Sequence, residues 1–354
     1  MISRVQTAKP RKSFKHGSYG CSRSISISDY EDCIVGFMED LPLIHCGHVH
    51  DKISSRGDRS CWAHLSLKDV LRASVGVLGE SPLGMTEKVV LLEGRICVLK
   101  RFRKVSVGKS EFGRRIERLA MISQKCKHLV PLTAYLYAKR IKFVLSDYFP
   151  MGSLADLLAG GRHHGNTALD WNQRLTIIHH IAQAIAFIHS QSPTQERLMQ
   201  MNVHGNVKAS NVMINTDFSA CLSDYGVSQL AQQVQLVPDN TWQRKPPALP
   251  LVPSHVYSDG LGQKCDIYNF GVIILEILAG PQAIVLKDFM IDSKASIREG
   301  CFEFFEFSVI DGKERKQASQ VLGIALACTN KSPEGRPPMD NILLYLEGIC
   351  NFNG

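Results

Sequence analysis

The stretch "VHGNVKASN", residues 203–211, decides the fold of this chain, because it has the residue pattern of an enzyme's catalytic loop. Such a loop places a proton-accepting carboxylate five residues before an asparagine that binds a metal ion. Asn211 stands in the metal-binding place, but Asn206 stands where the carboxylate belongs. Lys208 lies between them, where its ammonium group could meet a phosphate. The loop therefore predicts a phosphate and metal site that lacks its usual base.

Two further stretches supply the rest of this site. Asp224, in "SDYG" (223–226), follows Asn211 by thirteen residues and offers a carboxylate to a metal ion such as Mg²⁺. Upstream, Lys100 ends the strand-like run "ICVLK", and Glu117 follows seventeen residues later, where it could pair with this lysine. Each feature alone is weak evidence, because a lysine after a strand is common. In this order and spacing they predict a single site.

The spacing of apolar residues divides the chain into a strand-rich part and a helical part. "LKDVLRASVGVLGE" (67–80) indicates a short helix leading into a strand. Further strand-like runs are "KVVLLEG" (88–94), "RICVLKRF" (95–102) and "IKFVLSDYF" (141–149). Helical spacing covers residues 111–124, 171–190 with Asp170 as N-cap, and 266–279. Strands first and helices later predict an α+β fold with a small sheet lobe and a larger helical lobe.

From about residue 66 to 348 the chain resembles the protein kinases, and in particular the leucine-rich-repeat receptor-like kinases of plants. The resemblance covers about four fifths of the protein. The phrases that carry it are "LVPLTAY" (129–135), "DYFPMGSLADLLAG" (147–160), "LDWNQRL" (169–175), "VHGNVKASN" (203–211), "KCDIYNFGVIILEILAG" (264–280) and "CTNKSPEGRPPM" (328–339). It implies the bilobal protein-kinase fold, with a β-rich N-terminal lobe at residues 65–150 and an α-helical C-terminal lobe at 151–350.

The resemblance also implies a role for each residue of the site. Lys100, paired with Glu117, would bind the phosphates of ATP, and Lys208 would meet the transferred phosphate. Asn211 and Asp224 would bind Mg²⁺. In this family an aspartate in the long central helix, here Asp266, braces the catalytic loop. Gly79 and Gly84 would belong to the glycine-rich loop that covers the phosphates.

Two departures from the family pattern lie in the site itself. The amide of Asn206 can hold a substrate hydroxyl but cannot take its proton near pH 7, and general-base assistance is worth about 10²–10⁴ in rate. In the glycine-rich loop, Ser81 replaces the middle glycine and Pro82 removes an amide donor, while Glu80 adds a negative charge near the phosphate path. These changes should weaken nucleotide binding and phosphoryl transfer.

A third departure lies in the activation segment. Where the family has a glutamate that pairs with Arg336, this chain has Pro247, so we expect the arginine to reach solvent or to leave the peptide-docking loop loose. Between Ser228 and Thr241 there is no hydroxyl residue to serve as a phosphorylation switch. We therefore expect the docking of peptide substrates to be lost.

The sequence leaves two functions open. One is a receptor-like pseudokinase that binds ATP weakly, if at all, and signals through contacts with other protein kinases or receptor-like kinases. The other is a slow Ser/Thr kinase that uses Asn206 to position the substrate hydroxyl. A further alternative is that Lys100 and Glu117 persist only as a structural ion pair, with no ATP bound.

Composition limits the remaining classes. The 354 residues are 44% apolar with a net charge of +8, and no basic stripe with interleaved aromatic residues indicates nucleic-acid binding. Eleven scattered cysteines indicate free thiols in a reducing compartment. No run is apolar and long enough to span a bilayer, so we expect a cytoplasmic protein that reaches the plasma membrane through its partners. Residues 1–64, basic and rich in serine, are expected to be largely disordered.

Overall fold

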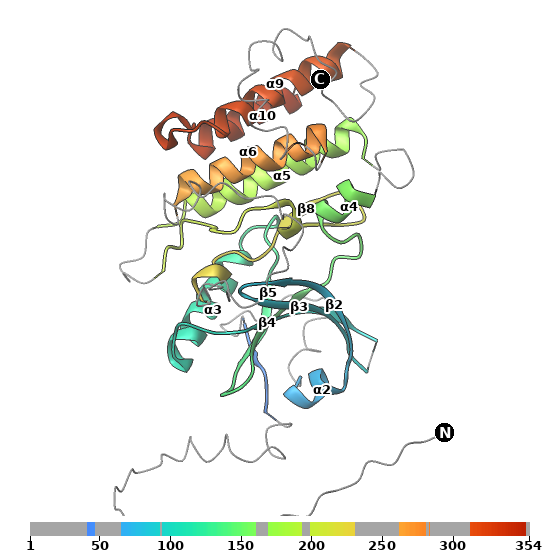
Figure 1. Cartoon of the computed structure of the whole chain (residues 1–354), viewed down its shortest axis with the longest axis vertical. Helices are drawn as coiled ribbons and strands as arrows, with labels where there is room; N and C mark the ends of the chain where they lie inside the picture. Colours follow the sequence, from blue (N-terminus) through green and yellow to red (C-terminus); the bar gives the residue numbers. More distant parts are fainter. Residues whose placement is uncertain are drawn as a thin grey trace, which may run out of the picture.

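The computed structural model of the chain describes residues 41–46, 65–92, 94–160, 169–192, 199–230, 262–280, 283 and 312–351. These residues form two lobes, a small one built on a β-sheet and a larger helical one, which lie one above the other in Figure 1. Strands from the first half of the chain build the sheet, and the long helices of the larger lobe come from the second half. The expected α+β bilobal fold is confirmed.

Six antiparallel strands form the sheet, in the order β1-β5-β6-β4-β3-β2. Their bounds are Ile44–His45 for β1, Ser74–Ser81 for β2, Gly84–Val90 for β3, Ile96–Phe102 for β4, Leu132–Tyr137 for β5 and Lys142–Asp147 for β6. The strand-like runs expected at 88–94 and 95–102 form the adjacent strands β3 and β4, whose register runs from Gly84 opposite Phe102 to Val90 opposite Ile96. This register directs Leu99 and Val89 into the core of the lobe.

Helices cover both faces of the sheet. The short helix α2 (Leu67–Arg72) begins at a capping box made by Ser66 and Asp69, and its Leu67 and Val70 pack on one face. The longer helix α3 (Lys109–Ser123) packs Phe112 on the other face. Because α3 adjoins the second lobe as well, its orientation decides what reaches the space between the lobes.

Within the described residues, five helices belong to the larger lobe, which are α4 (Leu154–Gly160), α5 (Trp171–His189), α6 (Gln263–Ala279), α9 (Gly312–Cys328) and α10 (Met339–Asn351). The predicted cap of α5 is present, because Asp170 and Gln173 form a capping box. The central helix α6 is apolar almost all round and lies between α5 and α9. At Gly271 it approaches α9 so closely that a β-carbon would lie 2.6 Å from that of Cys328.

Short elements connect the lobes. They are the 3₁₀ turns η4 (Ala209–Asn211) and η5 (Val227–Gln229) and the strands β7 (Val212–Ile214) and β8 (Ala220–Leu222), whereas the turn η7 (Pro333–Gly335) lies between α9 and α10 in the helical lobe. β7 and β8 form a hairpin under the sheet lobe, and the Val130 N–H donates to the Leu222 carbonyl at 3.0 Å. This hairpin carries the catalytic-loop motif on one side and the "SDYG" motif on the other, so both motifs face the sheet.

The N-terminal side of the chain requires one correction. Residues 41–46 fall within the segment expected to be disordered, yet Ile44 and His45 form β1 and pair with Tyr135 and Ala134 at the edge of the sheet. Leu43 is buried in the core beneath α2. The folded sheet lobe therefore includes residues before 65, whereas residues 1–40 and 47–64 lie outside the described residues.

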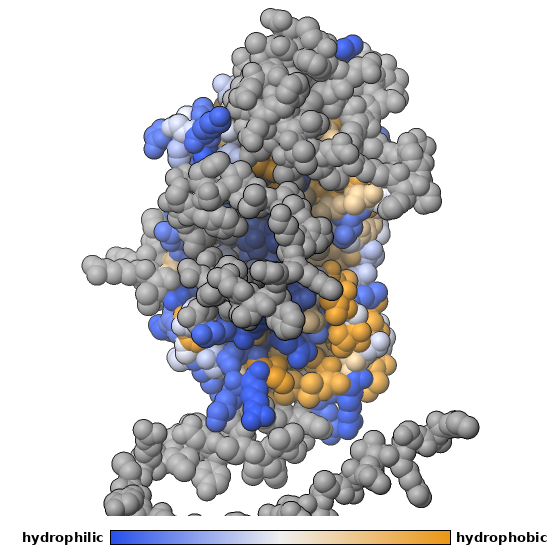
Figure 2. Space-filling view, viewed as in Figure 1, coloured by the Kyte–Doolittle hydropathy of each residue, from blue (hydrophilic) through white to orange (hydrophobic). Residues whose placement is uncertain are grey.

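The surface of the sheet lobe carries an apolar area beside β2. Figure 2 shows it at the lower right, where Figure 1 places β2 and α2. Its exposed side chains include Leu71, Val75, Val77 and Leu78. In the described part of the chain, no helix has both the length and the apolar composition needed to cross a membrane.

Candidate functional site

A cavity of about 350 Å³ lies between the two lobes. Its walls come from β2, β3, β4 and β6 of the sheet lobe and from α4, η4, β7 and the "SDYG" stretch of the other lobe. Of the predicted site residues, Gly79, Lys100, Lys208, Asn211 and Asp224 line it. The volume is in the range of small-molecule pockets. The structure thus brings five residues from distant parts of the sequence to one cavity.

The catalytic-loop stretch is held from below by Asp266 of α6. This carboxylate, 1% exposed, accepts the His204 N–H at 2.7 Å through Oδ2 and the Gly205 N–H at 2.9 Å through Oδ1. Its Oδ2 also lies 3.1 Å from the Nε2 of His189. The expectation that Asp266 braces the loop is confirmed. Charged acceptors of this kind make strong hydrogen bonds, so the backbone is fixed on both sides of the central glycine.

Asn206 and Asn211 are joined to each other within the loop. The Asn211 Nδ2 donates to the Asn206 carbonyl at 2.8 Å, and the Asn206 N–H donates to the His204 Nδ1 at 3.1 Å. The Asn211 carbonyl accepts both the N–H and the hydroxyl of Ser223. Asn206 lies just outside the residues that line the cavity. The loop therefore keeps its folded geometry although an amide occupies the place of the acid.

Asp224 faces into the cavity from a left-handed backbone conformation. Its φ is 64°, in the left-handed region that residues other than glycine and asparagine or aspartate rarely adopt. Gly226 follows with φ of 67° and donates its N–H to the His204 carbonyl at 3.3 Å. The buried Tyr225 donates its hydroxyl to the Met201 carbonyl, and burial raises the pKa of this phenol. These contacts hold the carboxylate of Asp224 toward the sheet lobe.

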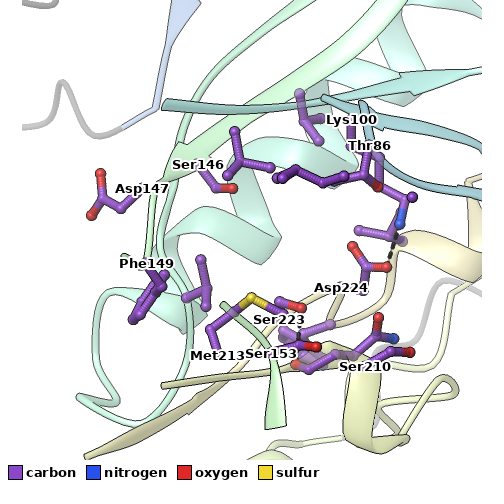
Figure 3. Close-up of a pocket in the computed structure, with 18 of the residues that line it drawn as sticks. Thr86, Lys100, Ser146, Asp147, Phe149, Ser153, Ser210, Met213, Ser223 and Asp224 are labelled. Carbon is purple, nitrogen blue, oxygen red and sulfur yellow. Dashed lines mark hydrogen bonds and ion pairs between the residues drawn. The ribbon is translucent and has the colours of Figure 1, made fainter. Parts of the chain in front are cut away.

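Lys100 pairs with Asp224. The two side chains form an ion pair across the cavity, which Figure 3 marks with a dashed line. Both are largely buried, with side chains 11% and 14% exposed. The lysine therefore lies beside the carboxylate that was expected to bind a metal ion, and the charges of the two offset each other.

The expected pair between Lys100 and Glu117 requires a correction. Glu117 is exposed on α3, and its Oε1 accepts the hydroxyl of Tyr135 at 3.0 Å. Burial and the neighbouring carboxylate raise the pKa of Tyr135, so the phenol keeps its proton for this bond. Among the ion pairs of the described residues, none joins Lys100 to Glu117. The idea that these two residues persist as a structural ion pair is wrong for this arrangement.

Hydrogen bonds to η5 hold α3 in this orientation. Arg115 of α3 donates to the Gln229 carbonyl at 3.3 Å. Ser106, just before α3, donates its N–H and its hydroxyl to the Leu230 carbonyl at 3.0 and 3.1 Å. These bonds tie the helix that carries Glu117 to the turn that follows the "SDYG" stretch. The position of Glu117 is thus a property of the packing between the lobes.

The glycine-rich stretch forms a tight hairpin between β2 and β3. Ser81 lies opposite Gly84, and its hydroxyl donates to the Gly84 carbonyl at 3.3 Å. A β-carbon at Gly84 would lie 1.8 Å from the Arg101 carbonyl oxygen, so only glycine fits there. Glu80 forms an exposed ion pair with Arg103, which offsets the negative charge expected near the phosphate path. The hairpin keeps its shape but offers few backbone donors to a phosphate.

Lys208 stands at the mouth of the cavity. Its side chain is exposed as a whole, but its pKa is lowered because the ammonium group is partly desolvated and lies near Lys100, while Asp224 opposes the shift. The cavity end that holds these three residues is the one where a phosphate would be attracted. Glu80, the other described acid at this end, is already paired with Arg103.

The other end of the cavity was not predicted from the sequence. Its walls are apolar and come from Val98 of β4, Val144 of β6 and Met213 of β7, with Asp147 and Phe149 at its far side (Figure 3). A flat apolar group such as a purine ring fits between such walls. The only signal in the sequence was the strand-like run that ends at Phe149, because strand ends often border ligand sites.

The expectation for Arg336 also requires a correction. The guanidinium is buried, with 6% of the residue exposed, and donates to the carbonyls of Asn330 and Lys264 at 2.9 and 3.0 Å. It also lies over the ring of Tyr268, 4.8 Å from the ring centre. Arg336 is therefore held inside the fold by these contacts and does not reach solvent. The stretch around Pro247 lies outside the described residues.

Comparisons with known proteins agree with this geometry. The family described as protein tyrosine and serine/threonine kinase matches residues 86–346. The chain is 33% identical to a protein of Arabidopsis thaliana named as a probable inactive receptor kinase, over 81% of this chain and 44% of the relative. It is 33% identical to another Arabidopsis protein, named as an inactive leucine-rich repeat receptor-like serine/threonine-protein kinase, over 78% of this chain and 41% of the relative. The chain thus spans less than half the length of these relatives.

Two solved structures share the fold. One is the pseudokinase domain of BIR2, described as an immune regulator of the RLK/Pelle family, with a TM-score of 0.68, 22% identity, and 93% of this chain and 95% of that one covered. The other is the kinase domain of maize SIRK1 bound to AMP-PNP, with a TM-score of 0.61, 26% identity, and 81% and 96% covered. Since the family match covers well over half of the residues, the chain belongs to the protein tyrosine and serine/threonine kinase family.

Proposed function

We propose that this chain is an inactive receptor-like kinase, a pseudokinase that binds a nucleotide weakly and acts in signalling through protein contacts. The observation that carries the proposal is the composition of the cleft. Lys100, Asn211 and Asp224 still line it, whereas Asn206 takes the place of the base and Glu117 is bonded to Tyr135 instead of to the lysine. The names of the Arabidopsis relatives support the same conclusion.

Phosphoryl transfer needs two arrangements that this cleft lacks. A carboxylate must accept the proton of the substrate hydroxyl, and the lysine and glutamate of the sheet lobe must be paired. Asn206 has no acid, and the Glu117 carboxylate is engaged by the Tyr135 hydroxyl. We therefore infer that transfer is slight or absent, although the loop itself is well braced.

Nucleotide binding is supported by the shape and polarity of the cavity. The purine would lie between Val98 and Met213, and its phosphates would point to Lys100 and Lys208. The maize kinase domain of the same fold, which is bound to AMP-PNP, supports nucleotide binding in general. Gly79 would border the ligand and Gly84 would keep the hairpin tight above it.

The fit of Mg²⁺ to this site is partial. Asp224 and the amide oxygen of Asn211 are the oxygen donors that would hold it, and the ion would lower the repulsion between phosphates. One oxygen of Asp224 is taken by Lys100. The described residues contain no group of three or more His, Cys, Asp or Glu side chains arranged for a metal ion. The site thus suits a weakly held ion at most.

Partners and location follow from the family. We infer that the partners are other protein kinases or receptor-like kinases, and that the chain works in the cytoplasm, at the plasma membrane through these partners. The support is the kinship with proteins named as receptor kinases. Residues 65–150 and 151–350 would be the two lobes that such partners contact.

The proposal is tested by separating binding from transfer. The melting temperature of the protein is measured with millimolar ATP, beside Lys100→Ala and, as a matched control, Lys139→Ala, whose side chain lies on an exposed turn far from the cavity. We expect ATP to raise the melting temperature of the protein and of the control but not of Lys100→Ala. No rise in the unmodified protein would contradict nucleotide binding.

Transfer is measured with labelled ATP, with and without Asn206→Asp. We expect no labelling that depends on Lys100 in the unmodified protein. The rate of Asn206→Asp should stay far below the roughly 1–100 per second of ordinary kinases, because Glu117 remains engaged by Tyr135. Labelling by the unmodified protein that Lys100→Ala abolishes would instead establish the slow Ser/Thr kinase.

A further inference from the structure

The phosphate end of the cavity carries more positive than negative charge. Lys100 and Lys208 both line it, and among the lining acids of the described residues Asp224 is the one beside them, while Glu80 of the hairpin is paired with Arg103. Asp224 already forms an ion pair with Lys100. Lys208 is close enough to both that each changes its pKa. Two ammonium groups thus share one carboxylate, which leaves a net charge of one to offset a phosphate.

The other acids near the cavity do not change this balance. Glu80 is exposed and paired with Arg103. Asp147 lies at the opposite, apolar end, where Figure 3 draws its carboxylate away from Lys100. Asp156 accepts the N–H and the hydroxyl of Ser153 at 3.1 and 2.7 Å, as an acid in the first turn of α4. None of these three carboxylates is directed at the space between the two lysines.

A divalent cation would find a poor site at this end. It needs several oxygen ligands, preferably carboxylates. Asn206 and Asn211 are neutral amides, and Asn211 uses its Nδ2 to bind the Asn206 carbonyl. To take both oxygens of Asp224, the cation would have to displace the Lys100 ammonium group from its ion pair. The repulsion between the cation and two lysines would oppose this exchange.

We propose that the cleft binds a nucleoside triphosphate without a divalent cation, with Lys100 and Lys208 neutralising the phosphates in place of the metal. On binding, the Lys100 ammonium group turns from Asp224 to the phosphates, and Lys208 closes on them from the mouth of the cavity. This inference rests on the proposed nucleotide binding. The inference goes beyond nucleotide binding in one respect, because it states which charged side chains neutralise the phosphates of the ligand.

The test is a titration of ATP into the intact chain by calorimetry, in EDTA and in Mg²⁺. We expect Kd in EDTA to be equal to or lower than Kd in Mg²⁺. The informative variant is Asp224→Asn, because asparagine tolerates the φ of 64° and the fold should persist. Its Kd in EDTA should fall about tenfold, the order expected from removing one screened unit charge. At a metal-dependent site the same change would weaken binding.

Two further variants test the same balance of charges. Lys208→Ala should raise Kd in EDTA about tenfold, by the same screened-charge reasoning. Asn206→Asp adds a carboxylate beside the cleft and should raise Kd in EDTA while making Mg²⁺ favourable. Circular dichroism spectra and melting curves check that each variant is folded.

The outcomes separate the two proposals. If ATP binds only with Mg²⁺, or if Asp224→Asn weakens binding in EDTA, the metal-free inference is overturned while the proposed nucleotide binding stands. If ATP binds under neither condition, the proposed nucleotide binding fails, and this inference fails with it.

Discussion

Replacing Asp266 tests whether the catalytic loop is held by one buried carboxylate. Asp266→Ala removes the acceptor of the His204 and Gly205 N–H groups, which lie 2.7 and 2.9 Å from its oxygens. Both donors would then lack a partner in a buried site. Asp266→Asn is a milder change, because its amide oxygen can still accept one N–H while its NH₂ group faces the other.

The two hydrogen bonds that are lost set the size of the effect. Each buried N–H left without an acceptor costs about 1–3 kcal/mol, so Asp266→Ala should lower the free energy of unfolding by about 2–6 kcal/mol. Since whole domains are stable by only about 5–15 kcal/mol, this variant could fail to fold. Asp266→Asn loses one of these two bonds and should cost about 1–3 kcal/mol, or roughly 1–5 °C in Tm for a chain of this size.

The measurement is urea unfolding followed by circular dichroism, with thermal melting beside it. The matched control is Asp217→Asn, at an exposed turn where the carboxylate accepts the Ser219 N–H at 2.9 Å and an amide can do the same. It should change the free energy of unfolding by less than about 0.5 kcal/mol. If Asp266→Asn proves as mild as this control, the carboxylate does not hold the loop, and the account of a braced but inactive loop is refuted.

Two further predictions concern the packing of the helical lobe. Gly271→Ala should destabilise the protein by about 1–3 kcal/mol, because the new β-carbon would lie 2.6 Å from the Cys328 β-carbon of α9. In Gly323→Ala, on α9, the new β-carbon meets no atom within 4 Å, so this control should stabilise the protein by up to about 1 kcal/mol. Equal urea midpoints of the two variants would contradict this. The pKa of His180 is lowered to about 4, mainly by burial and to a lesser degree by the neighbouring His128. The Nδ1 of His180 accepts the Ala220 N–H at 3.2 Å. Because the unfolded chain takes up this proton first, stability should fall as pH drops from about 6.5 toward 4, and His180→Asn, which keeps an acceptor, should flatten this part of the curve of stability against pH; an unchanged curve would count against the assignment.

The order of motifs along the chain was enough to predict the fold and most of the cleft. Lys100, Asn211 and Asp224 line one cavity as expected, and Asp266 braces the loop. The three cavity residues could be placed because their motifs are short and keep a recognisable order along the chain. The role of Asp266, which contacts His204 across 62 residues, came from the resemblance to the protein kinases. A strand that carries a lysine, or a loop closed by its own asparagine, folds in much the same way wherever its neighbours lie.

The partners of Glu117 and Arg336, by contrast, were decided only by tertiary packing. The sequence predicted Lys100 as the partner of Glu117, but in the structure Glu117 accepts the Tyr135 hydroxyl, and η5 is bonded to the helix that carries it. Arg336, which was expected to reach solvent or to leave the docking loop loose, is buried and donates to the carbonyls of Asn330 and Lys264 in the folded chain. The sequence determined which charged groups enter the cleft. Their pairing was left to the packing, because the groups that meet, such as Lys100 and Asp224, lie far apart along the chain and only the folded arrangement brings them together.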